Sequence, residues 1–174
     1  EPGAGSDLAN VQTRAVRDGG EWVVTGQKVW TSLAGISDGC FAIVRTEPGT
    51  ARHDGLSILL IPMRQPGVTV VPIRQMTGST EFAEVFFDGA RAPVDHVIGP
   101  VNGGWKVAMA TLAFERGAST LAQQLAFVGE LEAVVARAKA TGAASDPLVR
   151  DRIADLAVRL RVLRCNALRV LSPP

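Results

Sequence analysis

The sequence changes character near residue 100, and this change limits the folds open to the chain. Before that point, short runs rich in β-branched residues alternate with glycine and proline; after it, residues 105–140 hold helix-forming residues and no proline. Many short strands without helices between them are typical of barrels and sandwiches. A helix over residues 105–140 would be about 54 Å long, a length usually found in bundles. The pattern therefore predicts an α+β fold: an antiparallel β-barrel or sandwich domain over residues 1–100, followed over residues 101–174 by the long helices of an incomplete helical bundle.

Several segments before residue 100 show the short apolar or alternating pattern of strands. We expect a hairpin across the turn signal Asp18-Gly19-Gly20, and we expect Gly26-Gln27 to turn the chain into a further strand. The strands predicted in this way cover residues 10–17, 21–25, 28–32, 39–45, 56–61, 68–71 and 82–87.

The second region predicts two amphipathic helices. The first ends at Thr141-Gly142, and Asp146-Pro147 starts the second, with Asp146 as N-cap and Pro147 as the first helical residue. The residues expected to form the two buried stripes are Leu121, Leu125, Val128, Leu131 and Val135 in the first helix, and Val149, Ile153, Leu156, Leu160, Leu163 and Ala167 in the second. Such a pair needs further helices to cover it, so we expect the chain to be a fragment of a longer protein.

Composition excludes several classes of function. Eighteen basic and seventeen acidic residues give a net charge of +1, which argues against the basic field that nucleic-acid binding requires. No apolar run approaches the roughly 18 residues that span a bilayer. With two cysteines and two histidines, neither a disulfide framework nor a metal site is expected, and a cytoplasmic setting is predicted.

Two segments of the first region carry residue types that ligand sites use. Small residues at positions 3–7 let the backbone approach a ligand closely, and Ser6 adds a hydroxyl; a simple turn capped by Asp7 is the alternative. Trp30 is followed directly by Thr31 and Ser32. An indole wall beside hydroxyl donors suits a flat heteroaromatic ligand, and a core tryptophan at a strand end is the alternative.

A third segment, Glu115-Arg116, interrupts an apolar run of the long predicted helix. An acid in such a place is costly to bury unless it is paired or used, and a desolvated carboxylate can act as a general base. An ion pair on a solvated face is the alternative.

Together, these segments resemble the acyl-CoA dehydrogenases. The resemblance rests on EPGAGSD at residues 1–7, GQKVWTS at 26–32, FAEVFFDGARAP at 82–93 and NGGWKVAM at 102–109, with the Glu-Arg pair after them. It covers essentially the whole chain, as a middle β-domain and the first part of a C-terminal helical domain. The order and spacing of several motifs make it specific.

The resemblance implies a flavoprotein that uses FAD to desaturate an acyl-CoA thioester. A carboxylate removes the proton α to the carbonyl, a hydride leaves the β-carbon for the flavin, and an electron-transfer flavoprotein or similar acceptor takes the electrons. Homo- or heterotetramers are expected. By motif match, Ser6 would lie where flavin and substrate meet, Trp30 would flank the flavin ring, and Thr31 and Ser32 would bond near its N5 edge.

The same resemblance gives roles to the Glu-Arg pair. Arg116 would border the acyl pocket. Some members carry the base on a distant C-terminal loop, which this chain lacks, whereas others carry it as the Glu of this pair, and Glu115 occupies that position.

One stretch departs from the family pattern. Members often have Arg-Lys-Thr-Phe-Gly after the long helix, and its Arg reaches the flavin diphosphate of a neighbouring subunit. Here residues 138–146 contain Lys139 as their sole cation and no Phe. An alternative reading is therefore a non-catalytic or half-site partner subunit of a heteromeric acyl-CoA dehydrogenase. A further alternative is a different flavin reaction on this scaffold, such as that of a monooxygenase or a nitroalkane oxidase.

Overall fold

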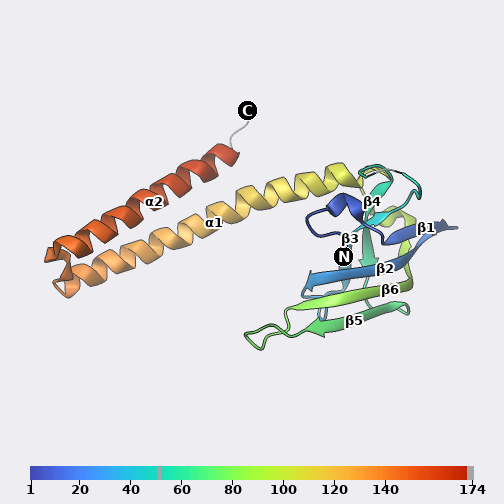
Figure 1. The fold of residues 1–174 in the computed structure, drawn as a ribbon, viewed down its shortest axis with the longest axis horizontal. Helices are drawn as coiled ribbons and strands as arrows, with labels where there is room; N and C mark the ends of the chain where they lie inside the picture. Colours follow the sequence, from blue (N-terminus) through green and yellow to red (C-terminus); the bar gives the residue numbers. More distant parts are fainter. Residues whose placement is uncertain (51, 172–174) are drawn as a thin grey trace. The chain divides into compact units, whose positions relative to one another are not determined.

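A computed structural model gives the fold of the chain (Figure 1). It describes residues 1–50 and 52–171, and the side chains of these residues apart from 116–120, 170 and 171. The chain divides into two compact units, Glu1–Met109 and Ala110–Pro174. Each unit is described by itself below.

The first unit is built on one seven-stranded mixed sheet with the order β5-β6-β2-β1-β3-β4-β7. Its elements are η1 (Leu8–Asn10), β1 (Arg14–Asp18), β2 (Glu21–Ser32), β3 (Gly39–Arg45), β4 (Leu56–Pro62), β5 (Val68–Ile73), β6 (Phe82–Pro93), η2 (Val94–His96) and β7 (Val97–Ile98). Neighbouring strands are antiparallel except β1 and β3, which run parallel and share one register pair, Arg14 with Arg45. The predicted α+β class is confirmed, with an open sheet rather than a closed barrel.

The predicted turn at Gly26-Gln27 is wrong, because β2 continues through it to Ser32. Gly26 has φ +147°, and a Cβ there would lie 2.6 Å from the Cα of Thr13. The glycine therefore serves a close approach between two backbones rather than a reversal of the chain. The register of β2 against β6 also shifts between Val24 and Thr25, as at a bulge.

The core of the first unit is a cluster of buried side chains, most of them from the strands of this sheet. Val24, Val44, Leu59 and Val85 are among its fully buried side chains. Each comes from a different strand. In β3, β6 and the first part of β2 the buried positions alternate with more exposed ones, which is a period-two pattern, whereas β4 is buried at most of its positions. Packing of the core therefore determines which side of β2 faces inward and where the end of β2 near Ser32 lies.

The second unit is a helical hairpin. It contains most of α1 (Gly104–Ala140), then η3 (Ala143–Ser145) and α2 (Pro147–Leu171). As predicted, Asp146 caps α2, since its Oδ1 accepts a hydrogen bond of 2.8 Å from the Leu148 amide. Gly142 has φ +77°, the left-handed conformation that commonly ends a helix. Neither helix, in its described residues, is long and apolar enough to cross a membrane.

The buried stripe of α1 differs from the predicted one at one position. Gln124 is 2% exposed, whereas Leu125 is 61% exposed. The observed inner face follows Leu121, Gln124, Val128, Leu131, Val135 and Ala138, a continuous spacing of three and four. Leu125 and Gln124 both lie three or four residues from Leu121 and Val128, and the prediction took the apolar one of the two. In α2, Leu156 is likewise exposed, while Ala167 is buried as predicted.

Candidate functional site

The end of β2 presents an aromatic ring to solvent in an unusual backbone conformation. Trp30 has φ +61° and is 61% exposed. Its backbone lies at a register irregularity, because Lys28 pairs with Val85 of β6 whereas Thr31 already pairs with Ala83. A bulky residue in the left-handed region is uncommon and persists only when its surroundings hold it there. This strained bulge turns the indole outward.

The neighbouring side chains complete what we call the shelf, defined as Trp30, Thr31 and Ser32. The Trp30 ring meets Phe82 of β6 edge to face, with centroids 6.1 Å apart and planes at 78°. Thr31 and Ser32 line a hollow of about 170 Å³ together with Cys40 and others. The shelf thus combines a flat apolar face with two hydroxyl groups.

The loop after the shelf adds exposed apolar surface. Leu33 has φ +56° and donates its amide hydrogen to the Glu81 carbonyl at 2.7 Å. Its side chain is 54% exposed, and that of Ile36 is 74% exposed. Apolar side chains gathered around an exposed indole mark a surface suited to an apolar ligand or partner.

Ser6 lies in a different hollow from the shelf hydroxyls. This hollow, of about 520 Å³, is also lined by Arg45, Arg52, His53 and Trp105. The His53 and Trp105 rings stack with centroids 4.1 Å apart. The Arg45 guanidinium donates to the carbonyls of Ala9, Val11 and Asp54 at 3.0 to 3.2 Å, so it ties the loop before β1 to the loop before β4. The structure thus places Ser6 beside cationic side chains, in a hollow that, among the described residues, is not the one lined by Thr31 and Ser32.

A buried ion pair near the shelf was missed by the sequence analysis. The Lys28 Nζ lies 2.6 Å from Glu1 Oε1, and the two side chains are only 13% and 7% exposed. Glu1 also accepts hydrogen bonds from the amides of Gln12 (2.7 Å) and Thr13 (3.1 Å). Lys28 donates a second bond to the Ile43 carbonyl at 2.6 Å. One sequence feature could have indicated this pair: a lysine stands two residues before the tryptophan. It lies in a strand whose first residues alternate between buried and more exposed positions.

This pairing shapes the titration of the buried groups. Burial alone would raise the pKa of Glu1, but its hydrogen bonds to Lys28, Thr13 and Gln12 outweigh that effect and lower the pKa from 4.5 to about 2. Burial lowers the pKa of Lys28, and Glu1 opposes that change. Burial raises the pKa of the Cys40 thiol, with Lys28 acting in the opposite direction. The carboxylate of Glu1 is therefore held ionised at neutral pH.

Glu115 belongs to the second unit, on α1. Its side chain is exposed, as is that of the preceding Phe114, at 75%. The Arg116 side chain, predicted to border an acyl pocket, lies outside the described residues. The structure thus gives Glu115 an accessible carboxylate on a helix, and the roles predicted for the Glu-Arg pair stay predictions.

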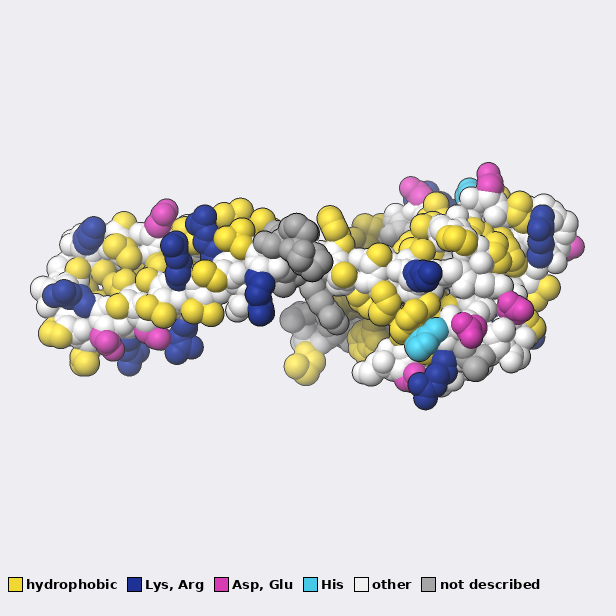
Figure 2. All heavy atoms as spheres, turned by 90° about the horizontal axis from the view of Figure 1, so that it is seen from above, with side chains coloured by type: hydrophobic (Ala, Val, Ile, Leu, Met, Phe, Trp, Pro, Cys, Tyr) yellow, Lys and Arg dark blue, Asp and Glu magenta, His cyan; other side chains and the backbone are white. Residues whose placement is uncertain are grey.

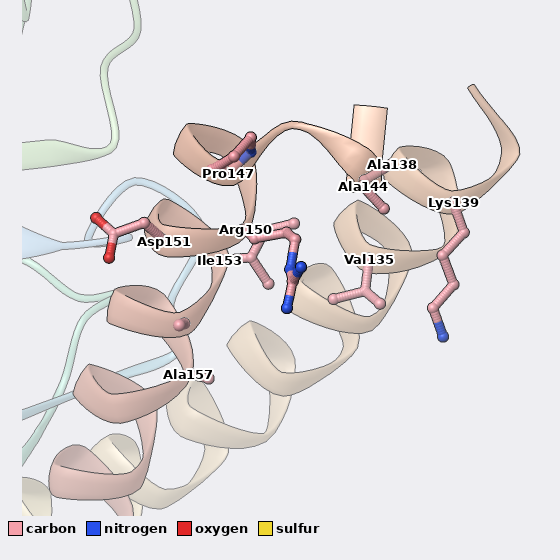
Figure 3. Close-up of a pocket in the computed structure, with 10 residues that line it drawn as sticks. Val135, Ala138, Lys139, Ala144, Pro147, Arg150, Asp151, Ile153 and Ala157 are labelled. Atoms are coloured by element: carbon pink, nitrogen blue, oxygen red, sulfur yellow. The ribbon is translucent and has the colours of Figure 1, made fainter. Parts of the chain in front are cut away.

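The hairpin carries two hollows. One, of about 630 Å³, lies at its turn, where Figure 3 shows Arg150 extending from α2 toward α1 and Asp151 directed away from it. Ala138, the first residue of the stretch that departs from the family pattern, lines this hollow and is 7% exposed. The other, of about 330 Å³, is apolar and includes Phe127 and Leu160. Figure 2 shows hydrophobic side chains distributed along the hairpin among its arginines and lysines.

No group of three or more His, Cys, Asp or Glu side chains within reach of one metal ion occurs in the part of the chain that the structure describes.

Comparison with known proteins identifies two family models along the chain. Residues 1–90 match the model described as acyl-CoA dehydrogenase, middle domain, and residues 102–173 match the model described as acyl-CoA dehydrogenase, C-terminal domain. The acyl-CoA dehydrogenase IpdE1 of Mycobacterium tuberculosis (strain ATCC 25618 / H37Rv) is 55% identical over 174 residues, which is 100% of this chain and 45% of that protein. The acyl-CoA dehydrogenase IpdE1 of Mycolicibacterium smegmatis is 50% identical over 99% of this chain and 46% of its own length.

Comparison with solved structures also finds proteins similar to this chain. The Tcur3481-Tcur3483 steroid ACAD superposes with a TM-score of 0.85 at 36% identity, over 98% of this chain and 44% of that one. The ChsE4-ChsE5 complex from Mycobacterium tuberculosis gives a TM-score of 0.81 at 34% identity, over 98% and 45% of the two chains. The chain spans about half the length of the curated relatives that it matches.

Proposed function

This chain belongs to the acyl-CoA dehydrogenase family, and from that premise we propose that its protein uses FAD to introduce a double bond between the α- and β-carbons of an acyl-CoA thioester. In this proposal residues 1–100 are the middle β-domain and residues 101–174 are the start of the C-terminal helical domain. We further propose an acyl-CoA from lipid or steroid degradation as substrate, since one solved relative, Tcur3481-Tcur3483, is a steroid ACAD.

The observation that carries the proposal is the shelf. The isoalloxazine ring system of FAD is flat, with an apolar dimethylbenzene end and hydrogen-bonding atoms at its pyrimidine end and its N5 edge. An exposed indole next to two hydroxyls fits such a ring, and the strained bulge at Trp30 is the kind of backbone feature that accumulates at ligand sites. Thr31 and Ser32 would bond to the polar rim while Trp30 flanks the ring.

In the proposed reaction, the cofactor accepts the hydride and the chain removes the proton. A bound flavin would supply the acceptor for the hydride that leaves the β-carbon. We propose that the Glu115 carboxylate removes the α-proton, which becomes acidic because the thioester carbonyl stabilises the developing negative charge. Ser6, in its cationic hollow, would contact flavin and substrate where they meet, and Arg116 would border the acyl group.

Partners follow from the same reaction. The electrons must leave the reduced flavin, and we propose an electron-transfer flavoprotein or a similar acceptor for this step. The proposed assembly is a homo- or heterotetramer, and the proposed location is the cytoplasm.

A half-site subunit is the second candidate function. It is favoured by residues 138–146, where Lys139 is the sole cation and Ala138 is packed into the hairpin. Two solved relatives are each named for a pair of proteins, Tcur3481-Tcur3483 and ChsE4-ChsE5. In this candidate, a partner subunit supplies the cation that holds the flavin diphosphate. A preparation of this subunit alone, fully loaded with FAD and fully active, would contradict it.

The shelf can be tested by flavin affinity. In the full-length protein, purified with any partner subunit, Trp30→Ala should weaken FAD binding by about 10- to 100-fold, because one aromatic contact with a flat ring is lost. Trp30→Phe should lose less. Flavin absorbance after ultrafiltration measures the affinity, and Val71→Ala, at a 43%-exposed position on β5, is the control. Equal affinity in all four proteins would show that the flavin is held elsewhere.

A further inference from the structure

We propose that Glu1 and Lys28 form a positioning pair, which holds the end of β2 in the conformation that presents the shelf and also anchors the loop that carries Ser6. The inference rests on the flavin role proposed for the shelf. The pair touches neither cofactor nor substrate in this account.

The sheet has a gap beside the second half of β2, where β1 no longer pairs with it. β1 pairs with β2 only from Glu21 to Thr25. From Gly26 onward, the ladder partners of β2 among the described residues all lie on its other side, in β6. Side chains bridge this gap: Thr13 Oγ1 donates to the Gln27 carbonyl at 3.1 Å, and Lys28 reaches the Ile43 carbonyl of β3.

Lys28 lies directly before the register irregularity that contains Trp30. It is the last residue of β2 that pairs with β6 before the irregularity, and Trp30 follows two residues later in its left-handed conformation. Such a conformation is unfavourable for a bulky side chain and must be imposed by its neighbours. β6 restrains the bulge from one side, and the bridge from Lys28 to Glu1 and Ile43 restrains it from the other.

Glu1 also contacts the loop that carries Ser6. The Glu1 carboxylate accepts three hydrogen bonds, and its own backbone carbonyl accepts one from the Ala4 amide at 3.2 Å. Ser6 follows two residues later. Glu1 thereby contacts both the beginning of the Ser6 loop, through its backbone carbonyl, and the strand that leads to Trp30, through its buried carboxylate.

Separating the charges of Glu1 and Lys28 would cost free energy. Both side chains are nearly excluded from water, so either charge without its partner would be buried and uncompensated. The pair is therefore replaced together in the test. The double variant Glu1→Gln/Lys28→Met removes both charges, keeps similar volumes and leaves no isolated ion. The matched control is Glu21→Gln, which breaks an exposed pair with Arg91 at the other end of the same strand.

Two measurements on the full-length protein decide the matter. Amide hydrogen exchange of the apoprotein should be about tenfold or more faster over residues 29–32 in the double variant, with β4 unchanged as the internal reference. FAD affinity should fall by about tenfold or more. The Glu21→Gln control should leave both at wild-type values.

Each other outcome overturns the inference. Exchange over residues 29–32 and FAD affinity both near wild type would show that the pair does not position the shelf. Equal acceleration in β4, or a double variant that does not fold, would show a general contribution to stability instead. A wild-type protein that binds no FAD would contradict the proposed function, while the exchange measurement on the apoprotein would still test the pair.

Discussion

Replacing Glu115 with Gln should slow flavin reduction by an acyl-CoA by about 10²- to 10⁴-fold, while FAD remains bound. Gln keeps the size and polarity of the side chain but cannot accept the α-proton. The flavin contacts proposed here come from the first unit, so the substitution should leave FAD affinity unchanged. Stopped-flow absorbance of the full-length protein, with any partner subunit, measures the rate directly.

The control for this prediction is Glu132→Gln, another exposed glutamate of α1. It should react at the wild-type rate. If Glu115→Gln also reacts at that rate, the base is another residue, such as one beyond this chain. If Glu115→Gln loses its FAD, the residue contributes to cofactor binding rather than to proton removal.

Replacing Glu1 with Gln should destabilise the first unit by about 3 kcal/mol at pH 7. The folded pKa of Glu1 is lowered from 4.5 to about 2, so the folded state favours the ionised carboxylate. This stability is fully present above pH 4.5 and is lost as the pH falls through about 2. The variant also leaves the Lys28 charge buried without its partner.

Urea unfolding of the full-length protein at several pH values tests this second prediction. The wild type should lose stability between pH 4.5 and 2, and Glu1→Gln should lose much less over that range. Glu21→Gln, whose carboxylate forms an exposed pair with Arg91, should resemble the wild type throughout. Parallel pH profiles for the wild type and Glu1→Gln would contradict the role given to the pair.

Local patterns in the sequence were sufficient to predict most elements of the fold. The alternating residues of β3, the short apolar run of β4 and the cap at Asp146 are determined by neighbours a few positions away. Gly26 was misread because a glycine signals both turns and close contacts, and only the position of Thr13 distinguishes them. Leu125 was misplaced because the helix phase, rather than hydrophobicity, decides which side chain is buried.

The candidate site was predictable where it is local in sequence. Trp30, Thr31 and Ser32 are consecutive, so their grouping follows from the strand itself. The pairing of Glu1 with Lys28 joins residues 27 positions apart through a gap in the sheet, which strand periodicity does not reveal. The separation of Ser6 from the hollow of Thr31 and Ser32 likewise depends on how the loops around Arg45 are tied together.

The most direct test of the account is the absorption spectrum of the full-length protein, purified with any partner subunit, before and after addition of acyl-CoA thioesters. The account predicts a yellow protein whose flavin band is lost when its own acyl-CoA substrate is added under anaerobic conditions. A colourless preparation that takes up no added FAD would contradict it. So would a flavin that a phenol or a nitroalkane reduces and that no thioester reduces.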